Sequence, residues 1–163
     1  MLRSILLAAL TGSALTAAEE AIVTVRPPEE LKLKSGQAEE AAIELVVQKG
    51  FHVQANPAAN EFLIPLTLTV EPTEALAVRA PRYPRASRYR LKGTNEDLLV
   101  YDGVITVPVA IRSSASTAAG VHTLQGKVRY QACDDRSCRP PVTAPFELKV
   151  RVLPKRSKPQ ISD

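Results

Sequence analysis

The chain contains two cysteines, Cys133 and Cys138, and both lie in the segment YQACDDRSCRPP at residues 130–141. Four residues separate them, and the surroundings predict a hairpin tip where a disulfide could open and close with little disturbance elsewhere. Closing so short a loop removes little entropy from the unfolded chain, about 2 kcal/mol against about 4 to 5 kcal/mol for a hundred-residue loop. A disulfide here would stabilise the fold only weakly, which makes a redox role possible.

Charged residues adjoin both cysteines and should make the two sulfurs unequal. They are Asp134, Asp135, Arg136 and Arg139. Thiol–disulfide exchange needs a thiolate, so nearby charge affects its rate. The carboxylates follow Cys133 and should disfavour its thiolate, whereas the guanidinium groups flank Cys138 and should favour its thiolate. If the side chains point as their positions suggest, this asymmetry favours Cys138 as the sulfur that exchanges. The chain has no C-x-x-C, so a thioredoxin-type catalyst is not expected.

A structural disulfide is the alternative interpretation of the pair, because most cysteine pairs in exported domains are inert. The chain would then be a non-catalytic secreted module that binds or assembles through the surface of its sandwich. The reduction potential separates the two interpretations. A structural bond should lie below about −300 mV, and a relay should lie higher.

The two histidines, His52 and His122, raise the question of a metal site. Both would have to converge with the two thiolates, and nothing in the sequence indicates that they do. His122 lies on an otherwise apolar strand face, where a packed and hydrogen-bonded histidine is more common. No metal or cofactor is expected, and no arrangement of Ser, His and Asp or of paired carboxylates indicates hydrolysis.

The first eighteen residues have the three parts of an export signal. Arg3 provides the positive start, residues 5–10 begin a short apolar stretch, and residues 16–18 are small enough for cleavage. This pattern predicts a signal peptide at 1–18, cleavage near Ala18, and a periplasmic or otherwise secreted protein in a compartment where disulfides persist. No segment approaches the ~20 apolar residues of a membrane helix, so stable membrane insertion is not expected.

The rest of the sequence is predicted to form one domain at 19–152, followed by a basic polar tail at 153–163. Thirteen prolines, seven glycines and no tryptophan accompany short runs of Val, Leu, Ile and Thr. Alternation of apolar and polar residues predicts strands at 105–111, 122–130 and 146–152, with further candidates at 22–25, 42–47, 62–70 and 75–78. Seven to nine short strands and no long helix predict an all-β, antiparallel β-sandwich.

Two further features bear on edges and partners. Pro65 and Pro108 lie within strand patterns, so they should occupy edges or bulges.

The formal net charge of +4 becomes +3 once Arg3 leaves with the signal. Because aromatics are few and no amphipathic helix is present, contact with nucleic acid or membrane is not expected. The chain is expected to be a monomer.

Three segments together resemble a known family, the N-terminal periplasmic domain of the bacterial thiol:disulfide interchange protein DsbD. The segment at 130–141 looks like its active-site hairpin, GFHVQANP at 50–57 is similar to an early segment, and VYDG at 100–103 is similar to a middle one. The resemblance implies an immunoglobulin-like sandwich that relays reducing equivalents between periplasmic thiol proteins. It also implies that Cys138 forms mixed disulfides with partners and that Cys133 resolves them.

The resemblance implies partners and a cap as well. Thioredoxin-like proteins are the expected partners, and because the sequence stops at Asp163, a separate membrane reductant channel is the expected donor. The aperiodic stretch at 81–99 is the candidate for a cap that shields the sulfurs, with Tyr89, Leu98 and Leu99 as its covering side chains. Tyr130 is expected to pack beside the cysteine hairpin.

Overall fold

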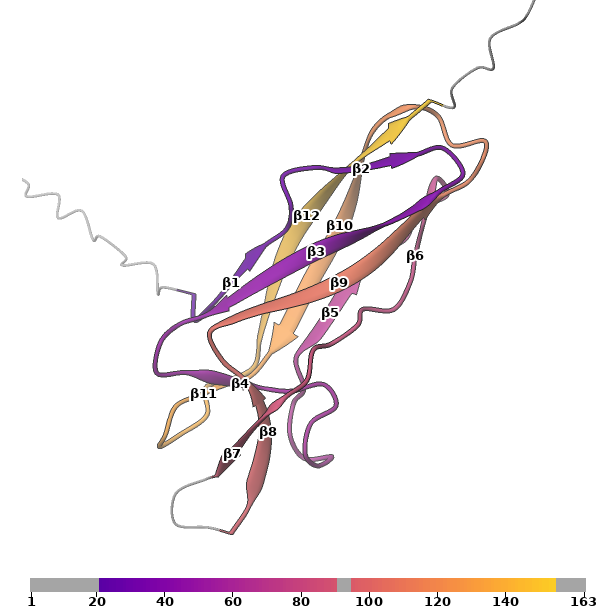
Figure 1. The fold of residues 1–163 in the computed structure, drawn as a ribbon. Helices are drawn as coiled ribbons and strands as arrows, with labels where there is room; N and C mark the ends of the chain where they lie inside the picture. Colours follow the sequence, from indigo (N-terminus) through magenta and orange to yellow (C-terminus); the bar gives the residue numbers. More distant parts are fainter. Residues whose placement is uncertain (1–20, 91–94, 155–163) are drawn as a thin grey trace, which may run out of the picture.

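The structure is a computed structural model that describes residues 21–90 and 95–154, and within these ranges it contains strands and loops but no helix (Figure 1). The predicted signal peptide and residues 155–163 of the tail lie outside the described residues. The strands are β1 (Val23–Arg26), β2 (Leu31–Lys34), β3 (Ala38–Val47), β4 (His52–Gln54), β5 (Thr67–Val70), β6 (Leu76–Val78), β7 (Ser87–Arg90), β8 (Asp97–Tyr101), β9 (Val104–Ser113), β10 (Gly120–Tyr130), β11 (Ala132–Cys133) and β12 (Val142–Leu153).

Two four-stranded sheets form the body of the sandwich. One has the order β1-β3-β9-β6 and the other β2-β12-β10-β5. In Figure 1, β3 and β9 cross in front of β12 and β10. Every second residue of the long strands is buried, as in Ile43 and Leu45 of β3 and Leu148 and Val150 of β12. This alternation gives each sheet one apolar face, and the two faces meet in the core.

The second sheet holds one close contact that requires a glycine. Gly126 of β10 lies opposite Phe146 of β12, and a Cβ atom at position 126 would collide with the Phe146 ring. The ring therefore fills the space that the missing side chain leaves. The same sheet contains a parallel pair, since β2 runs parallel to β12, whereas the other paired strands are antiparallel.

A third sheet, called the end sheet here, has the order β11-β4-β8-β7 and lies at one end of the body (Figure 1). Its strands are short, from two residues in β11 to five in β8. The β7–β8 hairpin projects away from the body, and Arg90 at the end of β7 donates hydrogen bonds of 2.7 and 3.0 Å to the Asp97 carboxylate. Cys133 belongs to this sheet, and Cys138 faces it in an isolated bridge.

The predicted all-β sandwich is confirmed, with differences in individual strands. The pattern at 62–70 extended too far, since β5 begins at Thr67 and Phe62 is 87% exposed. The reason is a turn in which the Asn60 side chain accepts a hydrogen bond from the Phe62 N–H, so the apolar residues there belong to a loop. Pro65 accordingly precedes the strand. The stretch at 81–99, which shows no period in the sequence, contains β7 and part of β8.

Pro108 lies in the middle of β9, which is an inner strand, yet its missing N–H disrupts no ladder. The pairing with β6 covers only residues 111–113, and the Pro108 carbonyl accepts a 3.0 Å hydrogen bond from the Arg82 N–H of a loop. The side of β9 at Pro108 is therefore a local edge, as predicted. Within the described ranges, no helix is long and apolar enough to cross a membrane.

Candidate functional site

The cysteine hairpin is closed by the main chain as well as by sulfur. Cys133 and Cys138 face each other in an antiparallel bridge and are joined by a disulfide. The Asp134 N–H donates to the Ser137 carbonyl at 2.9 Å, and the Arg139 N–H donates to the Ala132 carbonyl at 2.8 Å. The loop between the cysteines thus has its own hydrogen-bonded frame.

Asp134 holds this loop with its side chain. Its Oδ1 atom accepts hydrogen bonds from the N–H groups of Arg136 at 2.8 Å and Ser137 at 2.7 Å. These backbone hydrogen bonds hold the pKa of the Asp134 carboxyl below its usual value, so the group stays ionised. The negative charge is therefore fixed at the turn of the loop, while Asp135 next to it is exposed.

The two cysteines differ in burial. Cys133 is 2% exposed and lies in β11, whereas Cys138 lies on the outer arm of the hairpin and is exposed. The Gln54 amide donates a long hydrogen bond of 3.9 Å from Nε2 to the Cys133 sulfur. The end sheet buries one sulfur of the pair and leaves the other residue at the surface.

Strand register shows which side chains share the face of Cys133. Residues that pair directly across antiparallel strands point to the same face, as do residues two apart along a strand. Cys133 pairs with His52, Gln54 pairs with Val100, and Leu98 pairs with Tyr89. One face of the end sheet therefore carries Cys133, His52, Gln54, Val100, Leu98 and Tyr89. We call it the cysteine face.

This register places the predicted cap residues on two different faces. The Tyr89 ring packs on the His52 ring with their centroids 4.4 Å apart, and Leu98 is 7% exposed on the same face. Leu99 points to the opposite face, where it packs against the sandwich core. Tyr130 ends β10 and is 2% exposed within that core, two residues before β11 begins.

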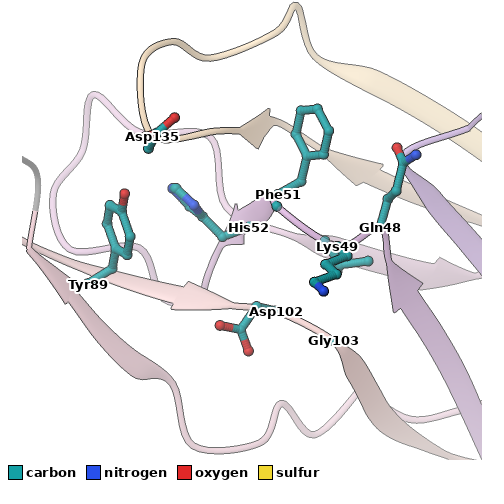
Figure 2. A pocket seen from close by; sticks show the side chains of 10 residues that line it. Gln48, Lys49, Phe51, His52, Tyr89, Asp102, Gly103 and Asp135 are labelled. Carbon is teal, nitrogen blue, oxygen red and sulfur yellow. The ribbon is translucent and has the colours of Figure 1, made fainter.

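An open cleft of about 670 Å³ adjoins the cysteine face (Figure 2). The lining residues come from the end of β3, the turn after it and the start of β4, from β7, from the β8–β9 turn and from the cysteine loop: Val47, Gln48, Lys49, Gly50, Phe51, His52, Tyr89, Asp102, Gly103 and Asp135. Figure 2 shows the His52 side chain extending between Tyr89 and the loop that carries Asp135. Arg139 lies over the Phe51 ring, 5.9 Å from its centroid, and joins the outer arm of the hairpin to the cleft.

His52 is a titratable group of this cleft whose pKa its surroundings change. It is 6% exposed, and burial lowers the pKa of its imidazole, although the carboxylates of Asp102 and Asp134 act in the opposite direction. A buried neutral imidazole therefore lies directly across from Cys133 in the strand ladder.

The sequence predicted the cysteines, Tyr89 and Leu98 as neighbours but did not assign a role to His52 or Gln54. Both are in β4, which has three residues, all buried, so it displays no alternation that could identify the face of each residue. The signal that was present is the resemblance at 50–57, which includes both residues. Among the described residues, no cluster of three or more His, Cys, Asp or Glu side chains could hold a metal ion.

The fold and the site define an immunoglobulin-like sandwich that carries one disulfide at its end sheet. Residues 19–149 match the family described as "Thiol:disulfide interchange protein DsbD, N-terminal", and the chain belongs to this family. No curated protein sequence matches the chain.

Three solved structures are similar to the chain. The N-terminal periplasmic domain of ScsB from Proteus mirabilis is 14% identical with a TM-score of 0.52; the match covers 84% of this chain and 49% of that one, so this chain spans about half its length. The reduced DsbD N-terminal domain of Neisseria meningitidis is 14% identical with a TM-score of 0.47, covering 72% of this chain and 82% of that one. The same Neisseria domain in complex with the PilB N-terminal domain is 14% identical with a TM-score of 0.44, covering 66% and 73%.

Proposed function

We propose that this protein is an exported relay that passes reducing equivalents through Cys133 and Cys138, with Cys138 as the exchanging sulfur and Cys133 as the resolving one. The observation that carries the assignment is the difference in burial. A partner's disulfide must come into contact with the attacking sulfur, so the attacking cysteine must be accessible. Cys138 is exposed, whereas Cys133 is only 2% exposed. A buried resolving sulfur next to it needs to reach only Cys138.

The exchange balances in two steps. The Cys138 thiolate attacks an acceptor disulfide, a bond forms between Cys138 and the acceptor, and the acceptor's other sulfur leaves as a thiolate. Cys133 then attacks the Cys138 sulfur, the internal disulfide forms, and the acceptor's second sulfur leaves. Two electrons have passed to the acceptor, and a donor dithiol restores the reduced pair by the reverse sequence.

The hydrogen-bonded frame of the cysteine loop supports a redox role over a structural one. Two main-chain hydrogen bonds and two to the Asp134 carboxylate already close the loop. A disulfide over so short a segment adds about 2 kcal/mol at most. The bond therefore adds little to the stability of the fold, which weakens the alternative of a binding or assembly module with a structural disulfide.

Tyr89 and Leu98 are the side chains that we assign to the cap. A reduced pair in an oxidising compartment benefits from a cover that opens for partners. Both side chains lie on the cysteine face, and Tyr89 packs on His52. Leu99 lies on the other face and supports the hairpin instead, while Tyr130 holds the end of β10 next to the cysteines. Asp134 and Asp135 contribute the negative charge of the loop.

The setting that we propose follows from the family. The signal peptide at 1–18 would direct the domain at 19–152 to the periplasm or outside the cell, where it would act as a monomer. Its partners would be thioredoxin-like proteins and a membrane reductant channel. The charge asymmetry of the hairpin and the aromatic rings of Phe51 and Tyr89 in the cleft would provide a surface for such a partner.

Trapping of mixed disulfides tests these roles. The Cys133→Ser variant should accumulate mixed disulfides through Cys138 in the periplasm, because no internal thiol remains to resolve them. Cys138→Ser is the matched control and should trap far less. Equal trapping by the two variants would contradict the assigned roles. A reduction potential below about −300 mV, together with no trapping by either variant, would favour the structural alternative.

A further inference from the structure

Two polar atoms stand out on the cysteine face. Among the buried side-chain nitrogen and oxygen atoms of residues 21–90 and 95–154, His52 Nε2 and Gln54 Oε1 have no hydrogen-bond partner. A buried polar atom without a partner costs stability, so native structures contain few of them, and these call for an explanation. Both atoms belong to β4, the strand that pairs with the cysteine strand β11.

Cys133 shares the cysteine face with both of these side chains. His52 is its direct partner in the ladder, and such residues have Cβ atoms about 4.5 to 5.5 Å apart. Gln54 is two residues further along the same face, with Nε2 3.9 Å from the Cys133 sulfur. A disulfide sulfur carries no hydrogen and can only accept, whereas a thiol can donate. Reduction of the disulfide therefore creates a donor on the face that carries both groups, each of which can accept a hydrogen bond.

We propose that His52 accepts the proton of the Cys133 thiol during the resolving step, and that the Gln54 amide holds the sulfur beside it. This inference rests on the proposed relay and deepens it, because it gives the buried cysteine a means of becoming a thiolate. A buried thiol is a poor nucleophile without a base, since removal from water disfavours its charged form.

The step balances as follows. In the mixed disulfide, the Cys133 thiol gives its proton to His52 Nε2, and the resulting thiolate attacks the Cys138 sulfur. The bond between Cys133 and Cys138 forms, the bond between Cys138 and the partner breaks, and the electron pair leaves on the partner's sulfur. The protonated imidazole returns the proton to that leaving thiolate. Gln54 donates to the sulfur while it carries charge, and rotation of its amide allows Oε1 to accept from the thiol.

The charged and titratable groups around His52 are compatible with this role. They come from β7, the β8–β9 turn, the cysteine loop and the turn before β4: Tyr89, Asp102, Asp134, Asp135 and Lys49. Burial keeps the imidazole neutral and able to accept a proton, while Asp102 and Asp134 stabilise the imidazolium once it forms.

The test is the reaction of the reduced full chain with dithiobis(nitrobenzoate), an aromatic disulfide that releases one coloured thiolate when Cys138 attacks and a second when Cys133 resolves. His52→Phe keeps a ring against Tyr89 but removes the proton acceptor. We expect its first release to stay close to that of the wild type and its second to slow by at least about tenfold near pH 7, in line with the usual contribution of a general base. The second release should recover as the pH rises and the thiol ionises without help.

Matched variants separate proton transfer from packing. His122→Phe, on β10, changes the other histidine and should leave both releases unchanged; it lies outside the site, with its Nε2 2.9 Å from the Ala118 carbonyl. His52→Gln keeps a polar side chain that cannot take the proton, and it should show the same selective loss if the phenylalanine variant folds poorly. Gln54→Leu should slow the second release without changing its pH profile.

The outcomes are distinct. An unchanged second release in both His52 variants, or an equal loss in both phases with no change of pH profile, would overturn the inference. If Cys133→Ser traps partners and the His52 variants resolve normally, only this inference fails. If the His52 variants lose the second release but no partner is trapped, the relay fails and the proton transfer stands.

Discussion

The sandwich body and the end sheet differ in the length of their strands and in the kind of side chain that they bury. The body contains four long strands of 10 to 12 residues, and its core holds aliphatic side chains such as Ile43 and Leu148 that are fully buried. The end sheet is built on strands of two to five residues, and it buries His52 and Gln54 next to a sulfur. Within the described ranges, the buried side-chain atoms without a partner belong to the end sheet.

Stability and reactivity therefore lie in different parts of the molecule. Burial of apolar area and close packing stabilise the body, and its buried polar side chain Ser113 has hydrogen-bond partners at Gly36 and Lys34. The end sheet contributes less apolar burial and retains polar groups whose hydrogen bonding depends on the redox state of Cys133. Changes in the body should therefore affect the free energy of unfolding, and changes in the end sheet should affect the rates of the cysteine pair.

The largest effect on stability is expected from the body. Leu148→Ala should lower the free energy of unfolding by about 2 to 5 kcal/mol, because Leu148 is completely buried in the core and the variant leaves a cavity. Urea denaturation measures this loss. The reaction rates of the cysteine pair should stay unchanged. A change in the reaction rates of the cysteine pair in this variant would show that the body also affects the reactivity of the end sheet.

Reduction of the disulfide should have a smaller effect. The two cysteines are only five residues apart in the sequence, so the disulfide closes a short loop. Reduction should therefore lower the free energy of unfolding by about 2 kcal/mol or less. Circular dichroism of the reduced chain should retain the β signal, and the melting temperature should fall only modestly. Complete unfolding on reduction would contradict the relay and favour a structural disulfide.

Removal of the cap side chains should change rate more than stability. Tyr89→Ala and Leu98→Ala should each speed the reaction of the reduced pair with a small alkylating reagent several-fold, because both side chains cover the cysteine face. Leu99→Ala is the matched control on the opposite face and should leave the rate unchanged. If Tyr89→Ala and Leu98→Ala react no faster than Leu99→Ala, the β7–β8 hairpin does not shield the sulfurs.

The smallest effect is a pH dependence of stability from His52. Burial lowers the pKa of its imidazole below the ordinary value of 6.5, so the unfolded chain binds a proton more readily than the folded one. The stabilisation is therefore complete above about pH 6.5 and declines as the pH falls through and below that value. His52→Phe should flatten the profile of unfolding free energy between about pH 8 and about pH 5, and His122→Phe should not. An unchanged slope in His52→Phe would contradict a buried neutral imidazole.

Sequence and structure agree best where the strands are long. Alternation predicted β9, β10 and β12 closely, because a strand of ten or more residues with one buried face repeats its period several times. The same signal failed at 62–70, where a turn set by Asn60 exposes Phe62, and it was silent for β2, whose parallel pairing with β12 depends on a distant part of the chain.

The candidate site divides in the same way. The sequence by itself determined the family, the hairpin with its cysteine pair, and the sandwich that supports it, because these depend on residue type, spacing and local alternation. Only the tertiary structure decided that Cys133 is buried while Cys138 is exposed, and that Leu98 and Leu99 point to different faces. The register between β11, β4, β8 and β7 is set by pairing between segments far apart in the chain, and strands of two to five residues are too short to display it in sequence. For the same reason, only the fold placed His52 and Gln54 beside the sulfur.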